Sequence, residues 1–227
     1  MSNRIPVVIV LLLLVSMQSH AQINAQLQKY ARANKQIDTS LNVQRVVFMG
    51  NSITEGWTPH AQTLFKNDHY INRGISGQTT PQMKARFTQD VINLKPKAVV
   101  ILAGINDIAQ NTGYITIAEI ANNIEAMTNM ALQKDIKVII CSVLPANSFP
   151  WRPEIKPANM VIELNQLLKN IAIRKEVRYL DYYSQMVNDH KGLKEAYTYD
   201  AVHCTKEGYM VMESLLLTCL KEELGTH

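Results

Sequence analysis

Three residues of this 227-residue chain carry the side chains that acyl transfer requires. Ser52 supplies a hydroxyl, His203 an imidazole, and Asp200 a carboxylate three positions before that histidine. A serine hydroxyl becomes a useful nucleophile only when an imidazole removes its proton, and the imidazole needs a carboxylate that fixes its tautomer and orientation. An aspartate and a histidine on one short loop can form that pair. The chemistry available to these three residues is the hydrolysis of an ester.

Negative charge develops on the carbonyl oxygen during such a reaction, and three groups are candidates to stabilise it. Fixed hydrogen-bond donors aimed at that oxygen form an oxyanion hole. We expect these donors to be the backbone amides of Ser52 and Gly77 and the side-chain amide of Asn106, with Asp107 as structural support. Each also has an ordinary interpretation. Ser52 could cap a helix because Glu55 follows three residues later, and glycine and asparagine are common in turns.

These candidates lie in four short blocks along the chain, at residues 50–54, 74–77, 104–107 and 200–203. With the four blocks present in this order, the chain resembles the GDSL or SGNH hydrolase superfamily of esterases and acylhydrolases. The resemblance extends from about Val46 to Tyr209. Its specificity lies in the combination, since any single block is common in other proteins.

The resemblance implies a role for each block. It implies that Ser52 is the nucleophile and that Asp200 and His203 complete a catalytic triad. It also implies that Gly77 and Asn106 belong to the oxyanion hole. These assignments agree with the chemistry expected from the residue types.

One position departs from the family's pattern. Where the family usually has Gly-Asp-Ser, this chain has Gly50, Asn51 and Ser52. The amide of Asn51 keeps the shape of the usual carboxylate but lacks its negative charge. The three triad residues are all present, so the change concerns the turn that carries the nucleophile and the charge near His203.

Apolar runs alternate with segments of helical periodicity, which is typical of a mostly parallel sheet with helices between its strands. Five strands are predicted, at residues 45–49, 69–72, 98–103, 137–144 and 177–182. Helices are predicted at residues 80–94, 117–133, 157–174 and 205–224, and a further helix at 23–37 is expected to pack outside the sheet. The predicted fold class is α/β, and the resemblance implies a three-layer α/β/α sandwich of flavodoxin-like type.

Ligands of open parallel sheets bind beyond the carboxyl ends of the strands, where the strand order reverses. The first three blocks each follow a predicted strand, so we expect them to meet at that edge. The loop at 145–157 follows the fourth strand and is expected to form a pocket wall. It contributes Trp151 and Arg152 as candidate substrate-binding residues, although the simpler interpretation is a packed ring and a solvated cation.

The first 21 residues have the pattern of a secretory signal peptide. Arg4 precedes an apolar stretch from Ile5 to Val15, and Ala21 ends a small-residue cleavage motif. The apolar stretch is too short to span a bilayer, which takes roughly 20 residues. We therefore expect cleavage after Ala21, a single catalytic domain at residues 22–227, no stable membrane insertion after cleavage, and a secreted or periplasmic protein.

Composition limits the partners and cofactors. The formal net charge is only +4, and no dense run of Lys and Arg is interleaved with aromatic residues, which argues against a nucleic-acid partner. The three cysteines, Cys141, Cys204 and Cys219, are too few for a disulfide scaffold, and a thiol nucleophile at Cys204 or a bridge to Cys219 is disfavoured. Outside the signal segment and the Asp200–His203 pair, the remaining histidines lack acidic or cysteine partners at ligand spacing, so neither a metal nor an organic cofactor is expected; they are His60, His69, His190 and His227.

The expected function is a secreted serine esterase for short-chain acyl esters, above all acetyl esters, with acetyl groups on carbohydrates as one candidate substrate. Lysophospholipids and thioesters remain alternatives within the same family. An α/β-hydrolase lipase is disfavoured because Thr54 replaces the second glycine of its Gly-x-Ser-x-Gly elbow. A non-catalytic binding module of flavodoxin-like shape would explain the glycine loops but not a complete triad.

Overall fold

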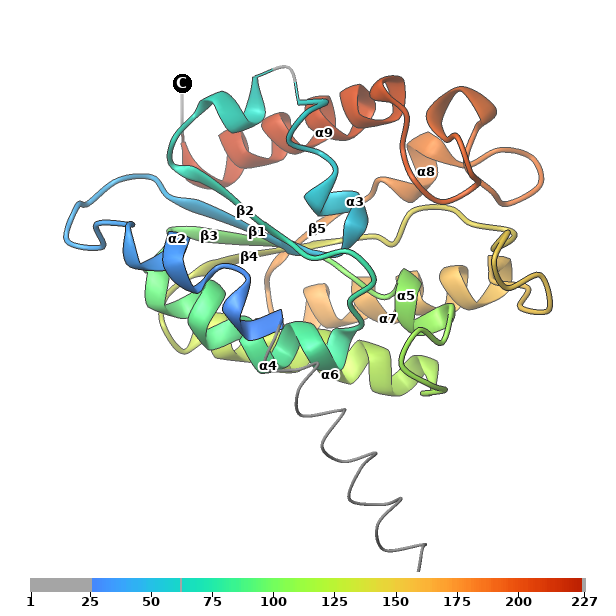
Figure 1. Ribbon diagram of the computed structural model, residues 1–227, viewed down its shortest axis with the longest axis horizontal. Helices are drawn as coiled ribbons and strands as arrows, with labels where there is room; N and C mark the ends of the chain where they lie inside the picture. Colours follow the sequence, from blue (N-terminus) through green and yellow to red (C-terminus); the bar gives the residue numbers. More distant parts are fainter. Residues whose placement is uncertain (1–25, 62, 226–227) are drawn as a thin grey trace, which may run out of the picture.

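In the computed structural model, which describes residues 26–61 and 63–225, the core is a five-stranded, all-parallel β-sheet (Figure 1). The strand order is β2-β1-β3-β4-β5. The strands are β1 (Val46–Gly50), β2 (Tyr70–Gly74), β3 (Ala98–Leu102), β4 (Lys137–Cys141) and β5 (Arg178–Leu180). Each of the five predicted strands is present, with somewhat different bounds, and every pair of neighbouring strands is parallel.

Helices cover both faces of this sheet. The longer ones are α4 (Thr80–Asp90), α6 (Ile117–Leu132), α7 (Ala158–Arg174) and α9 (Lys206–Leu224), and the shorter ones are α2 (Ala31–Lys35), α3 (Ser52–Glu55), α5 (Ile105–Ile108) and α8 (Tyr183–Met186). One layer contains α4, α6 and α7, and the other contains α3, α8 and α9 (Figure 1). The three-layer α/β/α architecture is therefore confirmed.

The central strands form because their side chains are apolar on both faces. Every residue of β1 and of β3 is buried, as expected for parallel strands that helices cover on each side. Two of the longer helices begin at polar caps. The Thr116 hydroxyl accepts a hydrogen bond from the Glu119 N–H at the start of α6. At the start of α9, the Thr205 hydroxyl accepts one from the Gly208 N–H. Strand and helix boundaries thus follow local sequence signals.

The structure differs from the predictions in several segments. The helix predicted at 80–94 divides into α4 and a short 3₁₀ helix, η2 (Ile92–Leu94), which ends at Lys95 in a left-handed conformation. The helix predicted at 23–37 is interrupted by a turn at Lys29 and Tyr30, and its first three residues lie outside the described residues. The remaining part packs against α4 through α2.

The sheet register brings the predicted blocks to one edge. Gly50 at the end of β1 pairs with Gly74 at the end of β2 and with Leu102 at the end of β3. Glycine is required at these ends because α3 packs closely on them. A Cβ on Gly50 would lie 1.9 Å from Thr54 Oγ1, and one on Gly74 would lie 2.2 Å from the Glu55 nitrogen. The carboxyl ends of three neighbouring strands therefore lie in register at one edge of the sheet, next to α3.

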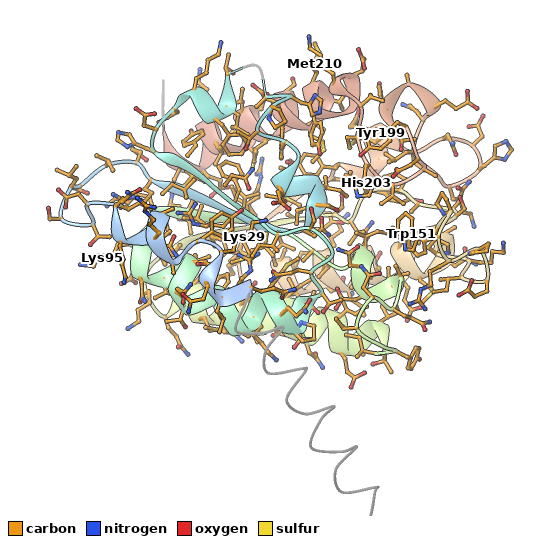
Figure 2. The ribbon with its side chains drawn as sticks, in the orientation of Figure 1. Lys29, Lys95, Trp151, Tyr199, His203 and Met210 are labelled. Carbon is orange, nitrogen blue, oxygen red and sulfur yellow. The ribbon has the colours of Figure 1, made fainter. Side chains whose placement is uncertain are left out.

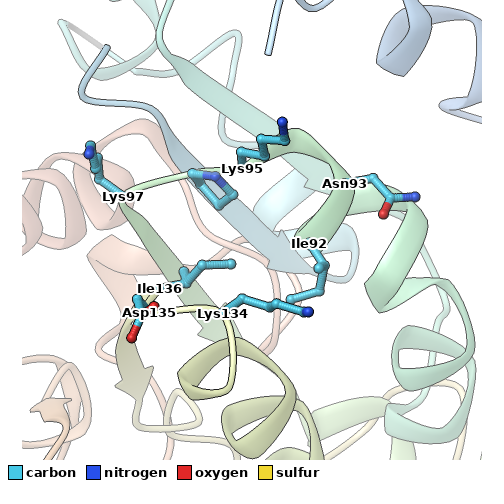
Figure 3. Close-up of a pocket in the computed structure, with 8 residues that line it drawn as sticks. Ile92, Asn93, Lys95, Lys97, Lys134, Asp135 and Ile136 are labelled. Carbon is cyan, nitrogen blue, oxygen red and sulfur yellow. The ribbon is translucent and has the colours of Figure 1, made fainter. Parts of the chain in front are cut away.

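The opposite end of the sheet carries a hollow (Figure 3). It is lined by residues of η2 and of the turns that lead into β3 and β4, including Lys95, Lys97 and Lys134. These turns lie at the amino ends of their strands, away from the predicted blocks. Across residues 26–61 and 63–225, none of the helices combines the length and apolar character needed to cross a membrane.

Candidate active site

Ser52 is the first residue of α3, directly after the turn that follows β1. Asn51 caps this helix, because its Oδ1 accepts a hydrogen bond from the Ile53 N–H at 3.0 Å. The capping-box alternative for Ser52 is wrong: Asn51 is the cap, and Glu55 bonds to Ser76 instead. The Asn51 amide oxygen therefore does the capping that a carboxylate oxygen would do, which explains how the turn tolerates the departure from Gly-Asp-Ser.

Ser52, His203 and Asp200 form a continuous chain of hydrogen bonds. Ser52 Oγ lies 2.9 Å from His203 Nε2, and His203 Nδ1 lies 2.6 Å from Asp200 Oδ2. An ionised carboxylate can only accept, so Nδ1 must carry the proton of the neutral ring. Nε2 is then the acceptor, and the Ser52 hydroxyl donates to it. This tautomer is the one in which the imidazole can remove the Ser52 proton.

The aspartate is held by its own loop. Asp200 Oδ1 accepts hydrogen bonds from the N–H groups of His203, at 2.7 Å, and of Val202, at 3.0 Å. Partial burial alone would raise the pKa of Asp200, but these bonds and the bond to the imidazole hold that pKa below its ordinary value. Ala201 closes the turn in a left-handed conformation, with φ of 71°. The carboxylate that faces the imidazole is therefore both oriented and ionised.

A buried tyrosine joins the two halves of the triad. Tyr209, in the first turns of α9, donates from its hydroxyl to the Ile53 carbonyl oxygen at 2.9 Å. Its ring stacks on Trp57, with centroids 5.8 Å apart. Because α9 begins just after His203 and Ile53 follows Ser52, this contact fixes the histidine loop against the nucleophile helix.

The segment Gly74–Gln78, which we term the oxyanion loop, lies beside Ser52. Gly77 has φ of 77°, and a Cβ there would meet no atom within 4 Å, so backbone conformation rather than space requires glycine. Asn111 Nδ2 donates to the Gly77 carbonyl oxygen at 3.2 Å. Within the described residues, the N–H groups of Ser52 and Gly77 have no hydrogen-bond acceptor. Both are available to a developing oxyanion.

Asn106 approaches the same loop from α5. It is buried, and its Nδ2 donates to the Gln78 carbonyl oxygen at 3.0 Å. A side-chain amide carries two N–H groups, so this bond orients the nitrogen and leaves its second hydrogen for another acceptor. The structure thus gives Asn106 the geometry of an anchored donor beside the oxyanion loop.

Asp107 connects the candidate site to the start of α4. Its carboxylate accepts bonds from the Thr80 N–H, at 2.9 Å, and from the Thr80 hydroxyl, at 2.6 Å, at the start of α4. Burial raises the pKa of Asp107 to about 6, although the bonds from Thr80 act in the opposite direction. The side chain points into the protein, which agrees with the structural role predicted for it.

A buried arginine was not predicted as part of the site. Arg86, on α4, is fully buried and donates to Gln78 Oε1 at 2.6 Å, to the Gly50 carbonyl oxygen at 3.1 Å and to Asp90 Oδ2 at 3.0 Å. It therefore connects the strand end before Ser52 with the oxyanion loop. The only sequence signal was an Arg–Asp pair at i,i+4, which is usually a solvated pair on a helix surface.

The loop after β4 reaches the triad through one of its two predicted residues. The Trp151 ring centroid lies 6.3 Å from that of His203. Arg152 is half-exposed, and no contact joins its side chain to the triad in the described part of the chain. Tyr199, which was not predicted, stacks on the other side of His203, with centroids 5.9 Å apart (Figure 2). Its position directly before Asp200 was the available signal.

The cysteines take no part in the site. Cys141, Cys204 and Cys219 are free and buried, and burial raises the pKa of Cys204 to about 12. A thiol with such a pKa is protonated at neutral pH and is a poor nucleophile. Among residues 26–61 and 63–225, no group of three His, Cys, Asp or Glu side chains is arranged to hold a metal ion.

Known proteins share this arrangement of sequence and fold. The chain matches the GDSL-like Lipase/Acylhydrolase family over residues 48–211. It is 46% identical to a presumed acylhydrolase from Bacteroides fragilis NCTC 9343, with a TM-score of 0.84 over 87% of this chain and 96% of that one. It is 44% identical to a GDSL-like lipase from Bacteroides thetaiotaomicron VPI-5482, with a TM-score of 0.84 over 87% and 98% of the two chains.

A curated relative is more distant. The chain is 22% identical over 214 residues to an acetylxylan esterase from Xylanibacter ruminicola, a match that covers 78% of this chain and 43% of the relative. The chain therefore spans less than half the length of that protein. The family match, by contrast, includes all four predicted blocks, with Ser52, Asp200 and His203 among their residues. The chain therefore belongs to the GDSL-like lipase/acylhydrolase family, a family of carboxylic ester hydrolases.

Proposed function

We propose that this protein is a secreted serine esterase that removes short acyl groups, above all acetyl groups, from carbohydrate hydroxyls. The observation that carries the proposal is the hydrogen-bonded chain from Ser52 through His203 to Asp200, with separations of 2.9 Å and 2.6 Å. The similarity to an acetylxylan esterase supports an acetylated polysaccharide as the substrate class.

Acylation of Ser52 is the first half of the proposed reaction. Ser52 Oγ attacks the ester carbonyl carbon while its proton passes to His203 Nε2, and the carbonyl electron pair moves onto oxygen. The amides of Ser52 and Gly77 and the Asn106 side chain stabilise that oxyanion. The carbon–oxygen bond to the alcohol then breaks, and the alcohol leaves with the proton that His203 returns.

Deacylation repeats the same steps with water. His203 removes a proton from a water molecule, which attacks the acyl carbon and forms a second tetrahedral intermediate. Its collapse breaks the bond to Ser52 Oγ, which recovers its proton from His203, and the carboxylic acid is released. Asp200 stays ionised throughout and stabilises the imidazolium, in keeping with the hydrogen bonds that lower its pKa.

The exposure of the site supports a short acyl group. Ser76 and Gly77 on the oxyanion loop are exposed, and so are Trp151 and Tyr199 beside His203. A pocket for a long acyl chain is a deep apolar concavity that buries most of its ligand. The hollow in Figure 3 lies at the opposite end of the sheet and includes no triad residue.

We also propose export, on the strength of the signal-peptide pattern in the first 21 residues. That segment lies outside the described residues. Expression of the full chain in a bacterial host, followed by amino-terminal sequencing of the periplasmic fraction, tests the proposal. A mature protein that begins at Gln22 supports it, and an uncleaved chain in the cytoplasm contradicts it.

Substrate preference can be measured with two series of esters. The first is p-nitrophenyl esters of two to twelve carbons, and the second is acetylated xylan and pectin fragments, with Ser52→Ala as the inactive control. We expect the highest kcat/KM at two to four carbons and release of acetate from the polysaccharides. An optimum at eight carbons or longer would contradict the short-acyl proposal in favour of a lysophospholipase.

A further inference from the structure

We propose that Trp151 and Tyr199 form a stacking platform that binds the sugar ring carrying the scissile ester. This inference rests on the proposed function and adds the binding site for the alcohol side of the substrate. The two residues come from segments far apart in the sequence, the loop after β4 and the loop before α9. Figure 2 shows them on either side of His203.

Both rings lie close to the imidazole at defined angles. The Tyr199 ring is nearly parallel to that of His203, with an interplanar angle of 14°, and the Trp151 ring is inclined to it by 33°. The Tyr199 N–H also donates to the His203 carbonyl oxygen, at 3.3 Å. A ligand that contacts these rings is therefore held within a few ångströms of the group that protonates the leaving alcohol.

The rings are supported from one side and open to solvent on the other. Trp151 is 46% exposed and Tyr199 is 71% exposed. Phe149, fully buried, stacks on Trp151 with centroids 5.4 Å apart, so the Trp151 side chain has a fixed backing. A single exposed aromatic residue is ordinary, but two beside one reactive group leave apolar surface where substrate must approach.

The chemistry of these rings suits a sugar better than an acyl chain. Tyrosine and tryptophan combine an apolar face with a polar edge, and they lose little conformational entropy when they bind a ligand. One face of a pyranose ring presents C–H groups, while its hydroxyls point outward and remain in water. Exposed aromatic rings on an open surface can cover that face, whereas a long acyl chain requires an enclosed pocket.

Kinetics with two acetate esters test the platform. The substrates are an acetylated xylotriose and ethyl acetate, which has no ring to stack, with acetate release measured for both. For Tyr199→Ala and Trp151→Ala we expect KM for the xylotriose ester to rise about tenfold, the order of effect of losing one stacking ring. The ratio of the two kcat/KM values should fall in proportion, and Tyr199→Phe and Trp151→Phe should largely restore it.

A matched control and an alternative outcome complete the test. Ile173→Ala removes an equally exposed apolar side chain, 68% exposed, near the carboxyl end of α7 at the opposite end of the sheet, and should leave the ratio unchanged. If the platform variants instead lower kcat equally for both esters, the rings only position His203, and the platform is wrong. Circular dichroism verifies that each variant is folded.

A binding measurement separates this inference from the proposed function. The chain has two tryptophans, and Trp57 is buried, so a sugar that stacks on Trp151 should change tryptophan emission through that residue alone. Titration of Ser52→Ala with xylotriose should give a saturable change that disappears in Ser52→Ala/Trp151→Phe. No saturable change contradicts the platform even if ester hydrolysis is found, and a saturable change supports it even if turnover of every ester fails.

Discussion

Glu55 and Ser76 join the nucleophile helix to the oxyanion loop. Glu55 lies three residues after Ser52, and its Oε2 accepts bonds from the Ser76 N–H at 2.7 Å and from the Ser76 hydroxyl at 2.5 Å. Its other oxygen pairs with Lys29 in the segment before β1. Partial burial would raise the pKa of Glu55, but the bonds from Lys29 and Ser76 hold it below its ordinary value. One carboxylate therefore sets the spacing between the hydroxyl that attacks and the amide of Gly77.

Removal of this carboxylate should weaken catalysis more than stability. We expect Glu55→Ala to lower kcat about tenfold or more, because a loosened oxyanion loop misplaces the Gly77 amide. Glu55→Gln keeps an oxygen that can accept from Ser76 and should retain most of the activity. The measurement is kcat and KM on p-nitrophenyl acetate, with urea unfolding as the control. Equal kcat for wild type and Glu55→Ala would show that the loop does not need this contact.

Asn51 should act through its cap rather than through charge. Asn51→Ala removes the acceptor for the Ile53 N–H and should lower the free energy of unfolding by about 0.5–2 kcal/mol. Asn51→Asp supplies an equivalent oxygen and should retain the cap. Urea denaturation of the three proteins at pH 7 gives both values. An Asn51→Ala protein as stable as the wild type would mean that the hydrogen bond of 3.0 Å contributes little.

Asn106 should contribute to the transition state and not to substrate binding. Loss of one oxyanion donor typically lowers kcat by about 10²–10³, so we expect that decrease in Asn106→Ala with little change in KM. Asn106→Asp is the isosteric comparison, since it keeps the shape but loses the donor, and it should be at least as impaired. A rise in KM with unchanged kcat in either variant would assign Asn106 to ground-state binding instead.

Asp107 should make stability depend on pH. Burial raises its folded-state pKa from 3.8 to about 6, so between these values the native protein holds a proton that the unfolded chain has released. The free energy of unfolding must then fall as the pH rises from 4 to 7, by up to about 3 kcal/mol for a shift of this size. Asp107→Asn has no carboxyl group to ionise at this position. Its free energy of unfolding should therefore increase relative to that of the wild type as the pH rises from 4 to 7. A difference independent of pH would contradict the raised pKa.

Much of the fold follows from local sequence. The strands β1 and β3 are continuous apolar runs because both of their faces are buried, and α6 and α9 start at Thr116 and Thr205, which cap them. The meeting of the three candidate triad residues could be predicted because each lies in a short block after a strand or before a helix. Parallel strands bring such blocks to one edge regardless of the intervening sequence.

The parts that could not be predicted depend on contacts between distant segments. Arg86 has the sequence pattern of a surface helix residue, and only the packing of α4 under the oxyanion loop buries it. Glu55 suggested a capping box, but its partner lies 21 residues away. For Tyr199 the only sequence signal was its position directly before Asp200. Its ring and that of Trp151 meet beside His203 only because two loops distant in the sequence come together there.

Ester hydrolysis at this site requires that Ser52 be an activated nucleophile, and covalent labelling tests this most directly. The full-length protein is treated with a fluorophosphonate probe at pH 7.5, and the modified peptide is identified by tandem mass spectrometry, with Ser52→Ala and His203→Ala as controls. We predict stoichiometric modification of Ser52 in the wild type, none at that position in Ser52→Ala, and much slower labelling in His203→Ala. A wild-type protein left unmodified at Ser52, or labelled equally fast without His203, would contradict the proposed mechanism.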